Sequence, residues 1–413
     1  MAEMTSTAQI TIGNLGKTYP GGNEALRDVS ISVESGTFLV LLGPSGSGKT
    51  TLLRCLAGIE RISTGRITIG GRVVADGRAH MPPDQRELSM VFQDYALWPH
   101  MSALDNVAFA LRRRHFSRAE CRTRAAAMLD RVGLGQLAAR FPNELSGGEQ
   151  QRVALARALI AGVGLILCDE PLSNLDADLR ERMRVEISTL VREAAATTVY
   201  ITHDQAEAFA LADQVGVLEQ GRLVQLGTPE EIYTEPATPF VARFTGLAGE
   251  LPVRVRTRHP DGTVLVEART ATSTPNGSAS GSAYGTFLAR ARHDALGETA
   301  TVLIRPTGVH LCAPGESGHH LTGRVTDVAF RGRGYEHAIE ITAPTHPSGH
   351  THLSDHINPS NPTHPSDRTH PSDRIQLTDY TQLTGVMADI RVPRGETVTL
   401  RLDPAACHAF PAP

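Results

Sequence analysis

Long apolar runs and an excess of positive charge are both missing from this 413-residue sequence. Its longest apolar stretch, ALIAGVGLILC, is shorter than the roughly 20 residues that a membrane-spanning helix needs, and it leads directly into acidic residues. The opening MAEMTSTAQI lacks the charged and then apolar layout of a signal peptide. A net charge of −4 gives no indication of a nucleic-acid partner. We therefore expect a soluble chain that reaches a membrane only through a partner.

Cysteine and lysine are scarce as well. The cysteines show no CxxC spacing, and we interpret them as reduced thiols of a cytosolic protein: Cys55, Cys121, Cys168, Cys312 and Cys407. Nearly all of the 40 basic residues are arginines, and the exceptions are Lys17 and Lys49. Lys49 lies inside a glycine-rich loop, so it stands out in a chain that uses lysine so sparingly.

Residues 1–246 alternate strand and helix signals. Short apolar runs such as TFLVLLG, VGLILCDEP and TTVYITHD are typical of buried strands. The helix signals between them include capping boxes, formed by Ser117 with Glu120 and by Thr228 with Glu231. This alternation predicts an α/β domain with a mostly parallel sheet and helices on both faces.

From about Leu247 the pattern changes to short β-rich runs separated by Gly, Pro and Asp, which predicts a small antiparallel β domain over 247–413. Two inserts interrupt it. One is the Gly/Ser loop STPNGSASGSAYG, and the other is a low-complexity segment at about 343–374 that ends in two tandem copies of THPSDR. The second has little to bury, so we expect it to be disordered, with histidines that do not converge on a metal.

The stretch GPSGSGKT, residues 43–50, matches the pattern G-x-x-x-x-G-K-T between a predicted strand and a predicted helix. Its glycines let backbone N–H groups converge on phosphate oxygens, and the helix N-terminus adds partial positive charge. Lys49 is placed to reach the β and γ phosphates of a nucleotide, and the Thr50 hydroxyl to ligate Mg²⁺. The sequence thus predicts a nucleotide-binding phosphate loop.

Two carboxylates follow the apolar run LILC, at the end of a strand where ligands bind in an open α/β sheet. Asp169 is suited to holding Mg²⁺, and Glu170 to orienting and deprotonating water beside the γ-phosphate. A second stretch with the character of a phosphate-binding helix start, LSGGEQQR, occupies residues 145–152. It cannot serve the same phosphates from the far side of one domain, but it can serve a nucleotide held by another copy.

Together these pieces resemble the ATP-binding-cassette (ABC) ATPases over about residues 1–246. The motifs occur in the family's order: KTYPGG, GPSGSGKTT, VFQDYALWPHM, LSGGEQQR, LILCDEP, SNLDADLR and ITHD. The resemblance implies a P-loop NTPase domain with a helical subdomain at about 95–160, and hydrolysis of ATP with Mg²⁺ as cofactor. It also implies a head-to-tail homodimer in which each LSGGEQQR meets the ATP of the other copy.

The resemblance assigns roles residue by residue. Tyr19 would stack on adenine, Gln93 would sense Mg²⁺ and the attacking water, and His203 would contact the γ-phosphate and act with Glu170 in catalysis. Asp176 would couple the two sites across the dimer. The ATP-binding set is Tyr19, Gly43, Pro44, Ser45, Gly46, Ser47, Gly48, Lys49, Thr50 and Thr51; the set that grips the opposite ATP is Ser146, Gly147, Gly148 and Gln150; the Mg²⁺ set is Thr50, Gln93 and Asp169.

The stretch DYALWPHMSALDNVAFAL implies a membrane partner, because in the family this region lines a groove that receives a helix of a membrane subunit. Here it carries Tyr95, Trp98 and Met101. We expect these side chains to be exposed in a loop and to form the docking site, since aromatic residues are favoured interface anchors. The alternative is that Trp98, the single tryptophan, fills the core of the helical subdomain.

Long coiled coils, a second cassette and fused membrane spans are missing, which argues against the chromosome-handling, translation and exporter members of the family. The stretches VLIRPTGVHL and LTGRVTDVAFRGRGYEHAIEI resemble instead the small β-barrel (OB-like) regulatory domain, called TOBE, of bacterial importer ATPases. Members usually have Arg-Pro-Glu where this chain has Arg305-Pro306-Thr307. The resemblance therefore implies an importer's ATPase subunit, peripheral on the cytoplasmic face of the membrane, working with permease subunits and a substrate-binding protein.

Several alternatives stay open. The sequence VFQDYALWPHM resembles that of the family branch that serves ferric iron, polyamines and quaternary amines. A sugar or oxyanion importer is the alternative. A soluble cassette that remodels a nucleic-acid or ribosomal partner is disfavoured by the acidic net charge and the β domain. The β domain is either a platform that holds the dimer or a sensor of a small ligand, and its lack of lysine favours the platform.

Overall fold

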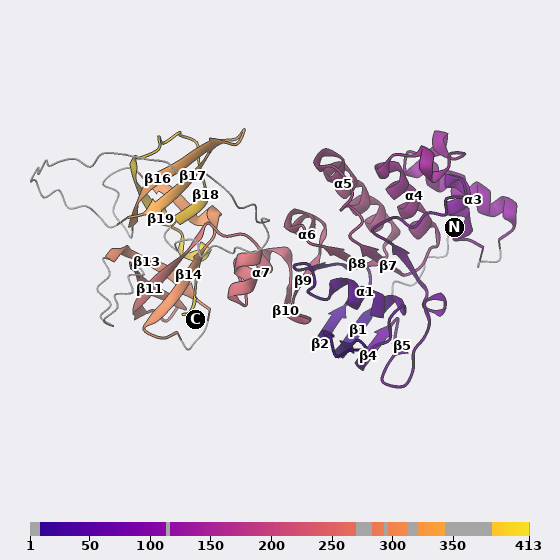
Figure 1. The fold of residues 1–413 in the computed structure, drawn as a ribbon, viewed down its shortest axis with the longest axis horizontal. Coiled ribbons are helices and arrows are strands. Elements are labelled where there is room, and N and C mark those ends of the chain that lie inside the picture. The colour runs from indigo at the N-terminus through magenta and orange to yellow at the C-terminus, as the bar shows by residue number, and fades with distance from the viewer. Residues whose placement is uncertain are drawn as a thin grey trace, which may run out of the picture. The chain divides into compact units, whose positions relative to one another are not determined.

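The computed structural model describes residues 9–112, 116–269, 283–292, 296–312, 320–342 and 382–412. The chain divides into two compact units, Met1–Val241 and Ala242–Pro413 (Figure 1). The low-complexity segment at about 343–374 and most of the Gly/Ser loop lie outside the described residues. Within the described ranges, no helix has both the length and the apolar character that crossing a bilayer requires.

A six-stranded sheet in the order β10-β9-β3-β8-β7-β6 forms the centre of the first unit. Its strands are β3 (Phe38–Leu42), β6 (Leu88–Val91), β7 (Leu165–Asp169), β8 (Thr197–Thr202), β9 (Gln214–Glu219) and β10 (Arg222–Gly227). All neighbours pair in parallel except β9 and β10. Strands β3, β7 and β8 are buried along their whole length, as strands covered on both faces should be. The predicted mostly parallel sheet is confirmed.

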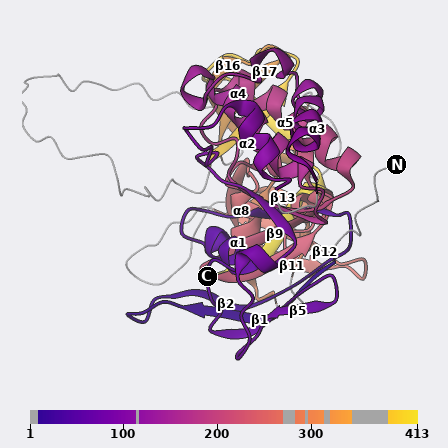
Figure 2. The same cartoon turned by 90° about the vertical axis from the view of Figure 1, so that its right-hand side faces the viewer.

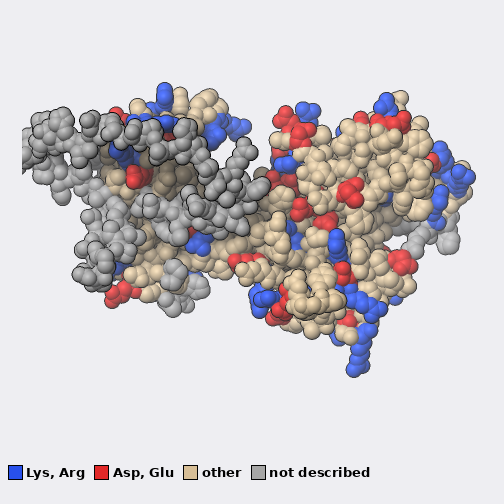
Figure 3. Space-filling view, in the orientation of Figure 1, with Lys and Arg blue, Asp and Glu red and all other residues tan. Residues whose placement is uncertain are grey.

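Helices pack on this sheet, and a helical region lies between β6 and β7 in the chain. The helices of the first unit are α1 (Lys49–Ala57), α2 (Ala103–Phe109), α3 (Arg118–Arg131), α4 (Gly147–Ile160), α5 (Ala177–Ala194), α6 (Gln205–Leu211) and α7 (Pro229–Thr234). The capping boxes predicted at the starts of α3 and α7 are both present, and Ser146 with Glu149 forms another at the start of α4. Side chains of both charge signs are interspersed over the face of this unit drawn in Figure 3.

An antiparallel sheet in the order β2-β1-β4-β5 also belongs to the first unit, and the sequence analysis did not anticipate it. Its strands are β1 (Ile10–Thr18), β2 (Glu24–Val33), β4 (Thr64–Ile69) and β5 (Arg72–Ala75). Register shifts between Ile12 and Leu15 break the alternation of apolar and polar residues that would have marked β1 as a strand. Figures 1 and 2 show this sheet beside α1, and its buried residues share one core with α1 and the central sheet.

The second unit contains a closed barrel in the order β11-β12-β13-β20-β14 and a five-stranded sheet in the order β15-β19-β16-β17-β18. The barrel strands are β11 (Gly249–Arg258), β12 (Thr263–Arg269), β13 (Ala283–Ala291), β14 (Thr299–Ile304) and β20 (Cys407–Pro411). The sheet strands are β15 (Val309–Cys312), β16 (His320–Phe330), β17 (Tyr335–Ile341), β18 (Gln382–Ala388) and β19 (Thr397–Leu402). One core of buried residues runs through both.

The antiparallel pairing expected for this unit fails at one place, because β13 and β20 pair in parallel. Strand directions cannot alternate all the way around a closed ring of five, so one neighbouring pair must be parallel. Arg305 anchors the chain that enters this barrel: its side chain is buried, and Nη1 donates to the carbonyls of Ala242 and Gly246 at 2.8 and 2.6 Å. The arginine of the Arg305-Pro306-Thr307 turn thus holds the segment that contains α8 (Pro239–Phe244).

His408 on β20 gives the second unit a testable dependence on pH. Burial, and then the charges of Arg292, Arg305 and Arg290, lower the pKa of His408 to about 3. The pKa of this histidine in the unfolded chain is about 6.5, so between pH 6.5 and 3 the unfolded chain binds a proton that the folded chain does not. The free energy of unfolding is therefore greatest above pH 6.5 and falls by about 1.4 kcal/mol per pH unit as the pH drops from about 6.5 toward 3. We expect His408→Gln to flatten this loss, as measured by hydrogen exchange in β14 and β20 at pH 7 and pH 5. Equal losses in both proteins would contradict it.

Candidate functional site

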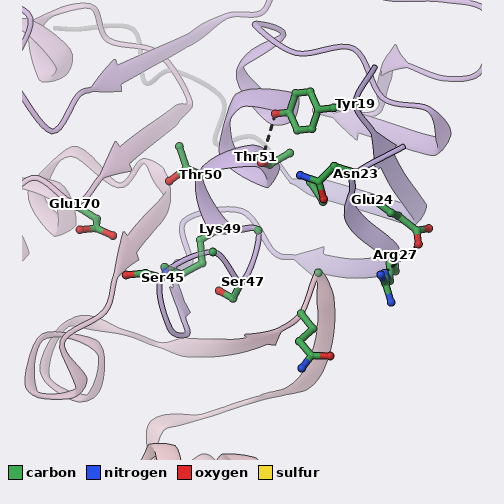
Figure 4. A pocket seen from close by; sticks show the side chains of 15 residues that line it. Tyr19, Asn23, Glu24, Arg27, Ser45, Ser47, Lys49, Thr50, Thr51 and Glu170 are labelled. Atoms are coloured by element: carbon green, nitrogen blue, oxygen red, sulfur yellow. Dashed lines mark hydrogen bonds and ion pairs between the residues drawn. The ribbon is translucent and has the colours of Figure 1, made fainter. Parts of the chain in front are cut away.

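The loop 43–50 forms one side of a pocket of about 630 Å³ in the first unit (Figure 4). Gly46 and Gly48 have φ values of 79° and 101°, in the left-handed region that favours glycine. A β-carbon on Gly48 would also lie 2.7 Å from the carbonyl oxygen of Ala25. The pocket is lined by Tyr19, Asn23, Glu24, Ala25, Arg27, Ser45, Gly46, Ser47, Gly48, Lys49, Thr50, Thr51, Glu170, Gln220 and Gly221. Most of the predicted ATP-binding residues therefore meet in one place.

Lys49 begins α1 and is almost fully buried. Its ammonium donates to the carbonyls of Gly43 and Pro44, at 2.7 and 3.0 Å, so the side chain lies folded back over its own loop. Burial lowers the pKa of Lys49, and the carboxylates of Glu170 and Asp169 oppose this shift. An anionic phosphate would favour the charged ammonium in the same way as these carboxylates do.

Asp169 and Thr50 are adjacent, as a shared cation site requires. The Thr50 hydroxyl donates to Asp169 Oδ1 at 3.3 Å, and Asp169 ends the buried strand β7. Burial raises the pKa of Asp169, and the hydrogen bond from Thr50 opposes the rise. A carboxylate and a hydroxyl at the mouth of a phosphate loop are oxygen donors of the kind that Mg²⁺ prefers.

Glu170 and His203 meet at the carboxyl ends of β7 and β8. Glu170 Oε2 lies 3.1 Å from His203 Nδ1, and the Glu170 side chain is 21% exposed against 59% for His203. The backbone of Glu170 has a φ of 43°, which is uncommon for a residue with a β-carbon. Its N–H donates to the carbonyl of Ile201, and the Ser173 hydroxyl donates to its carbonyl. The backbone of Glu170 is thus held by β8 and by Ser173, and its carboxylate contacts His203.

Two further predicted residues lie in the loops around this pair. Gln93 follows β6, and its backbone carbonyl accepts a hydrogen bond of 2.9 Å from the side chain of Asn174 in the loop after Glu170. Asp176 ends that loop as the N-cap of α5, where Oδ1 accepts from the Leu179 N–H. Both side chains are exposed, and neither belongs to the lining of the pocket.

The residues of LSGGEQQR lie apart from the pocket, at the start of α4. Ser146 is the N-cap, and its N–H and hydroxyl both donate to the Glu149 carboxylate. The backbone hydrogen bond from Ser146 is the main cause of a lowered pKa for Glu149. Gln150 donates to the carbonyls of Pro142 and Leu145, which braces the turn. Ser146 and Gly147 are exposed, and none of these residues lines the pocket described above.

The expectation that Tyr95 is exposed is wrong. Its side chain is 5% exposed, because Tyr95 and Ala96 both have positive φ values and turn the ring inward. The Arg157 guanidinium fixes this turn by donating to both of their carbonyls, at 2.8 and 2.7 Å. Burial accordingly raises the pKa of Tyr95.

Trp98 is half-buried and lines a groove of about 540 Å³. Its ring centroid lies 4.4 Å from that of Phe109, and the Arg157 guanidinium lies 4.9 Å from it. The groove is lined by Pro83, Asp84, Leu88, Ser89, Met90, Phe92, Ala96, Trp98, Ala110, Arg157 and Ala158. Met101 is half-buried and does not line this groove.

Sequence reasoning missed the part of the pocket that comes from other elements. The Gln220–Gly221 turn between β9 and β10 closes the floor, with the Gly221 N–H donating to the Ser47 carbonyl and the Arg27 N–H to the Gly221 carbonyl. The pair Gln-Gly is a recognisable turn signal, but its position under the phosphate loop depends on strand order. The pocket is also lined by residues at the start of β2 and by Asn23 just before it, and the sequence analysis did not predict this strand.

Comparison with known proteins gives consistent matches. A family model described as ABC transporter matches residues 26–173. The Fe(3+) ions import ATP-binding protein FbpC of Agrobacterium fabrum is 42% identical over 337 residues, which cover 81% of this chain and 89% of that protein. The sn-glycerol-3-phosphate import ATP-binding protein UgpC of Rhodopseudomonas palustris is 49% identical over 239 residues, 58% of this chain and 65% of that protein. A solved dimeric bacterial ABC transporter cassette is 32% identical, with coverage of 53% and 98% and a TM-score of 0.48.

Proposed function

Because the chain belongs to the ATP-binding, ATP-hydrolysing proteins of the ABC transporter family, we propose that two copies close on two ATP molecules and drive a solute importer. The observation that carries the proposal is the pair of Glu170 and His203, whose side chains lie 3.1 Å apart, with Glu170 lining the same pocket as the lysine of the phosphate loop. A base next to a buried lysine, at the carboxyl ends of parallel strands, suits hydrolysis of a bound triphosphate.

In the proposed reaction, water attacks the γ-phosphorus and the bond to the leaving β-phosphate oxygen breaks. Glu170 accepts the proton of that water, and His203 orients the carboxylate and faces the γ-phosphate. Lys49 would exchange its two loop carbonyls for phosphate oxygens. These groups act mainly by position and by stabilising charge on the transferred phosphoryl group.

The proposed cofactor is Mg²⁺, held by Thr50 and Asp169 with Gln93 nearby. When bound, Mg²⁺ would neutralise charge on the β and γ phosphates. The contact of 3.3 Å between the Thr50 hydroxyl and Asp169 supports this assignment, because both oxygens already face one point at the mouth of the loop. We include Gln93 among the Mg²⁺ residues because Asn174, in the segment after Glu170, donates a hydrogen bond to the Gln93 carbonyl and so holds the two loops together.

The homodimer is proposed because the start of α4 presents a phosphate-binding feature that its own pocket does not use. Ser146 and Gly147 are exposed, and the N-terminus of a 14-residue helix attracts anions. A head-to-tail pair with twofold symmetry would bring each of these starts to the opposite pocket and Asp176 to the interface.

A membrane permease is the proposed partner at the groove that contains Trp98, and the protein would then lie at the cytoplasmic face of the membrane. We expect Trp98→Ala to weaken co-purification with the permease by about tenfold or more, because a half-buried tryptophan is a typical interface anchor. Phe141→Ala is the matched control, since Phe141 is a 44% exposed aromatic residue outside the groove. Equal recovery of permease with both variants would rule the groove out as the docking site.

Ferric iron is the proposed cargo, with polyamines or quaternary amines in the same branch and a sugar or sugar phosphate as the alternative. The support is that the similarity to the Fe(3+) import protein continues into the second unit, over 81% of this chain, whereas that to the sn-glycerol-3-phosphate protein covers 58%. The test is uptake of labelled ferric iron and of labelled sn-glycerol 3-phosphate by cells that lack this chain. Loss of iron uptake alone supports the proposal, and loss of glycerol phosphate uptake alone overturns the choice of cargo.

A further inference from the structure

Lys17 is buried next to the residue expected to stack on adenine. It lies near the end of β1, and only 8% of it is exposed. Its ammonium lies 2.9 Å from the Glu60 carboxylate, donates to the Arg61 carbonyl at 2.8 Å, and stands 4.7 Å from the centroid of the Tyr19 ring. A lysine ammonium has three N–H donors, and here three groups surround it.

These contacts tie the Tyr19 ring to both ends of α1, the helix that begins in the phosphate loop. At the first turn of α1, the Tyr19 hydroxyl lies 3.5 Å from Thr51 Oγ1 (Figure 4). Beyond the last turn, Glu60 and Arg61 hold Lys17, and the Glu60 N–H in turn donates to the Arg54 carbonyl within the helix. The ring is therefore positioned relative to the phosphate loop from two directions.

We propose that Lys17 is a positioning residue that holds one face of Tyr19 so that the other face is ready to receive the adenine base. The inference rests on the proposed function, in which Tyr19 stacks on adenine. A buried cation is attracted to the face of an aromatic ring, and a ring that is already fixed loses less rotational freedom when a ligand binds. Lys17 thus controls affinity for the base and leaves the phosphate contacts alone.

This role also accounts for the presence of lysine in a chain whose other basic residues, apart from Lys49, are arginines. A compact ammonium can satisfy a carboxylate, a carbonyl and a ring face from one atom. The planar guanidinium of arginine directs its donors in a fixed fork and cannot replace that arrangement. Of the two lysines of the chain, Lys49 lines the pocket and Lys17 contacts Tyr19, which also lines it.

The test compares ATP with inorganic tripolyphosphate, which offers phosphates without a base, as ligands of the full chain in calorimetry with Mg²⁺. We expect Lys17→Met to weaken ATP binding about tenfold and tripolyphosphate binding less than twofold. Retained tripolyphosphate binding shows that the variant is folded with its phosphate loop intact. A parallel loss of both ligands, or a loss of neither, overturns the proposal.

A double-mutant cycle separates a role through Tyr19 from a general effect. In the Tyr19→Ala background, adding Lys17→Met should weaken ATP binding less than twofold further, because the ring that it positions is gone; a further tenfold loss overturns the proposal. Arg131→Met, which removes the exposed ion pair of Arg131 with Glu193, is the matched control. If Tyr19→Ala alone leaves ATP affinity unchanged, the adenine-stacking part of the proposed function fails, independently of how Lys17→Met behaves.

Discussion

Exchanging Glu170 for glutamine is expected to lower ATP turnover by about 10³-fold while ATP still binds, because the amide keeps the shape of the carboxylate but cannot accept the proton of water. The Glu170 carboxylate acts on Lys49 through its charge, and its described hydrogen bond is to His203, so the exchange leaves the hydrogen bonds of Lys49 within the phosphate loop in place. Phosphate release under saturating ATP with Mg²⁺ measures the loss. In gel filtration, the same variant should accumulate as a dimer in ATP, because closure occurs and the step that resets it does not.

The matched control is Glu181→Gln, which makes the same chemical change on α5 at a side chain that is 65% exposed and paired with Arg184. It should hydrolyse ATP as the unaltered chain does. If Glu170→Gln turns over ATP at the rate of this control, Glu170 is not the base, and the mechanism must be rebuilt around Lys49 and Asp169.

The second large effect is expected for Ser146→Arg, which should abolish the ATP-dependent dimer. The substitution places a long side chain on an exposed N-cap, where the opposite nucleotide would approach, and removes the hydroxyl that accepts from the Glu149 N–H. Loss of the cap alone costs about 1 kcal/mol of stability, so the monomer should stay folded and should still bind ATP. Gel filtration of Ser146→Arg in the Glu170→Gln background measures the effect.

Mixing two inactive variants tests whether the sites are shared between copies. Lys49→Ala would remove the proposed phosphate contact, and Ser146→Arg would block the proposed contact with the nucleotide of the other copy. A mixed dimer has one site with both changes and one site with neither. ATP should therefore assemble dimers in the mixture but not in either variant alone. Because about half of random pairs are mixed, about half of the pairs in the mixture can form such a dimer. If the mixture stays monomeric as well, while unaltered chains dimerise, LSGGEQQR does not act across an interface.

The parts of the site that the sequence predicted are those whose chemistry lies within a few adjacent residues. The phosphate loop needs its glycines, its lysine and the following helix, and all of these lie within 43–57. The carboxylates of Asp169 and Glu170, at the end of β7, could be located for the same reason. The positions of the Gln220–Gly221 turn and of Asn23 to Arg27 in the pocket lining could not be predicted, because they depend on which strands are neighbours.

Tyr95 and Lys17 show a second limit of sequence reasoning. A tyrosine next to polar residues in a presumed loop predicts exposure, but two consecutive positive φ values, stabilised by Arg157 from α4, reverse the direction of its side chain. Two of the three groups around the Lys17 ammonium, the Glu60 carboxylate and the Arg61 carbonyl, likewise come from more than forty positions away. Local sequence propensity carries no information about contacts with residues so distant in the chain.

The left-handed backbone of Glu170 sets stability against activity at one position. A residue with a β-carbon pays on the order of 1 kcal/mol to hold a φ of 43°, whereas glycine adopts it freely and asparagine adopts it more readily than most. Selecting variants of this chain for heat resistance alone should therefore enrich glycine or asparagine at position 170 and yield chains that no longer turn over ATP. In the proposed mechanism, glutamate stands at position 170 because the reaction needs a carboxylate there, against the preference of the backbone.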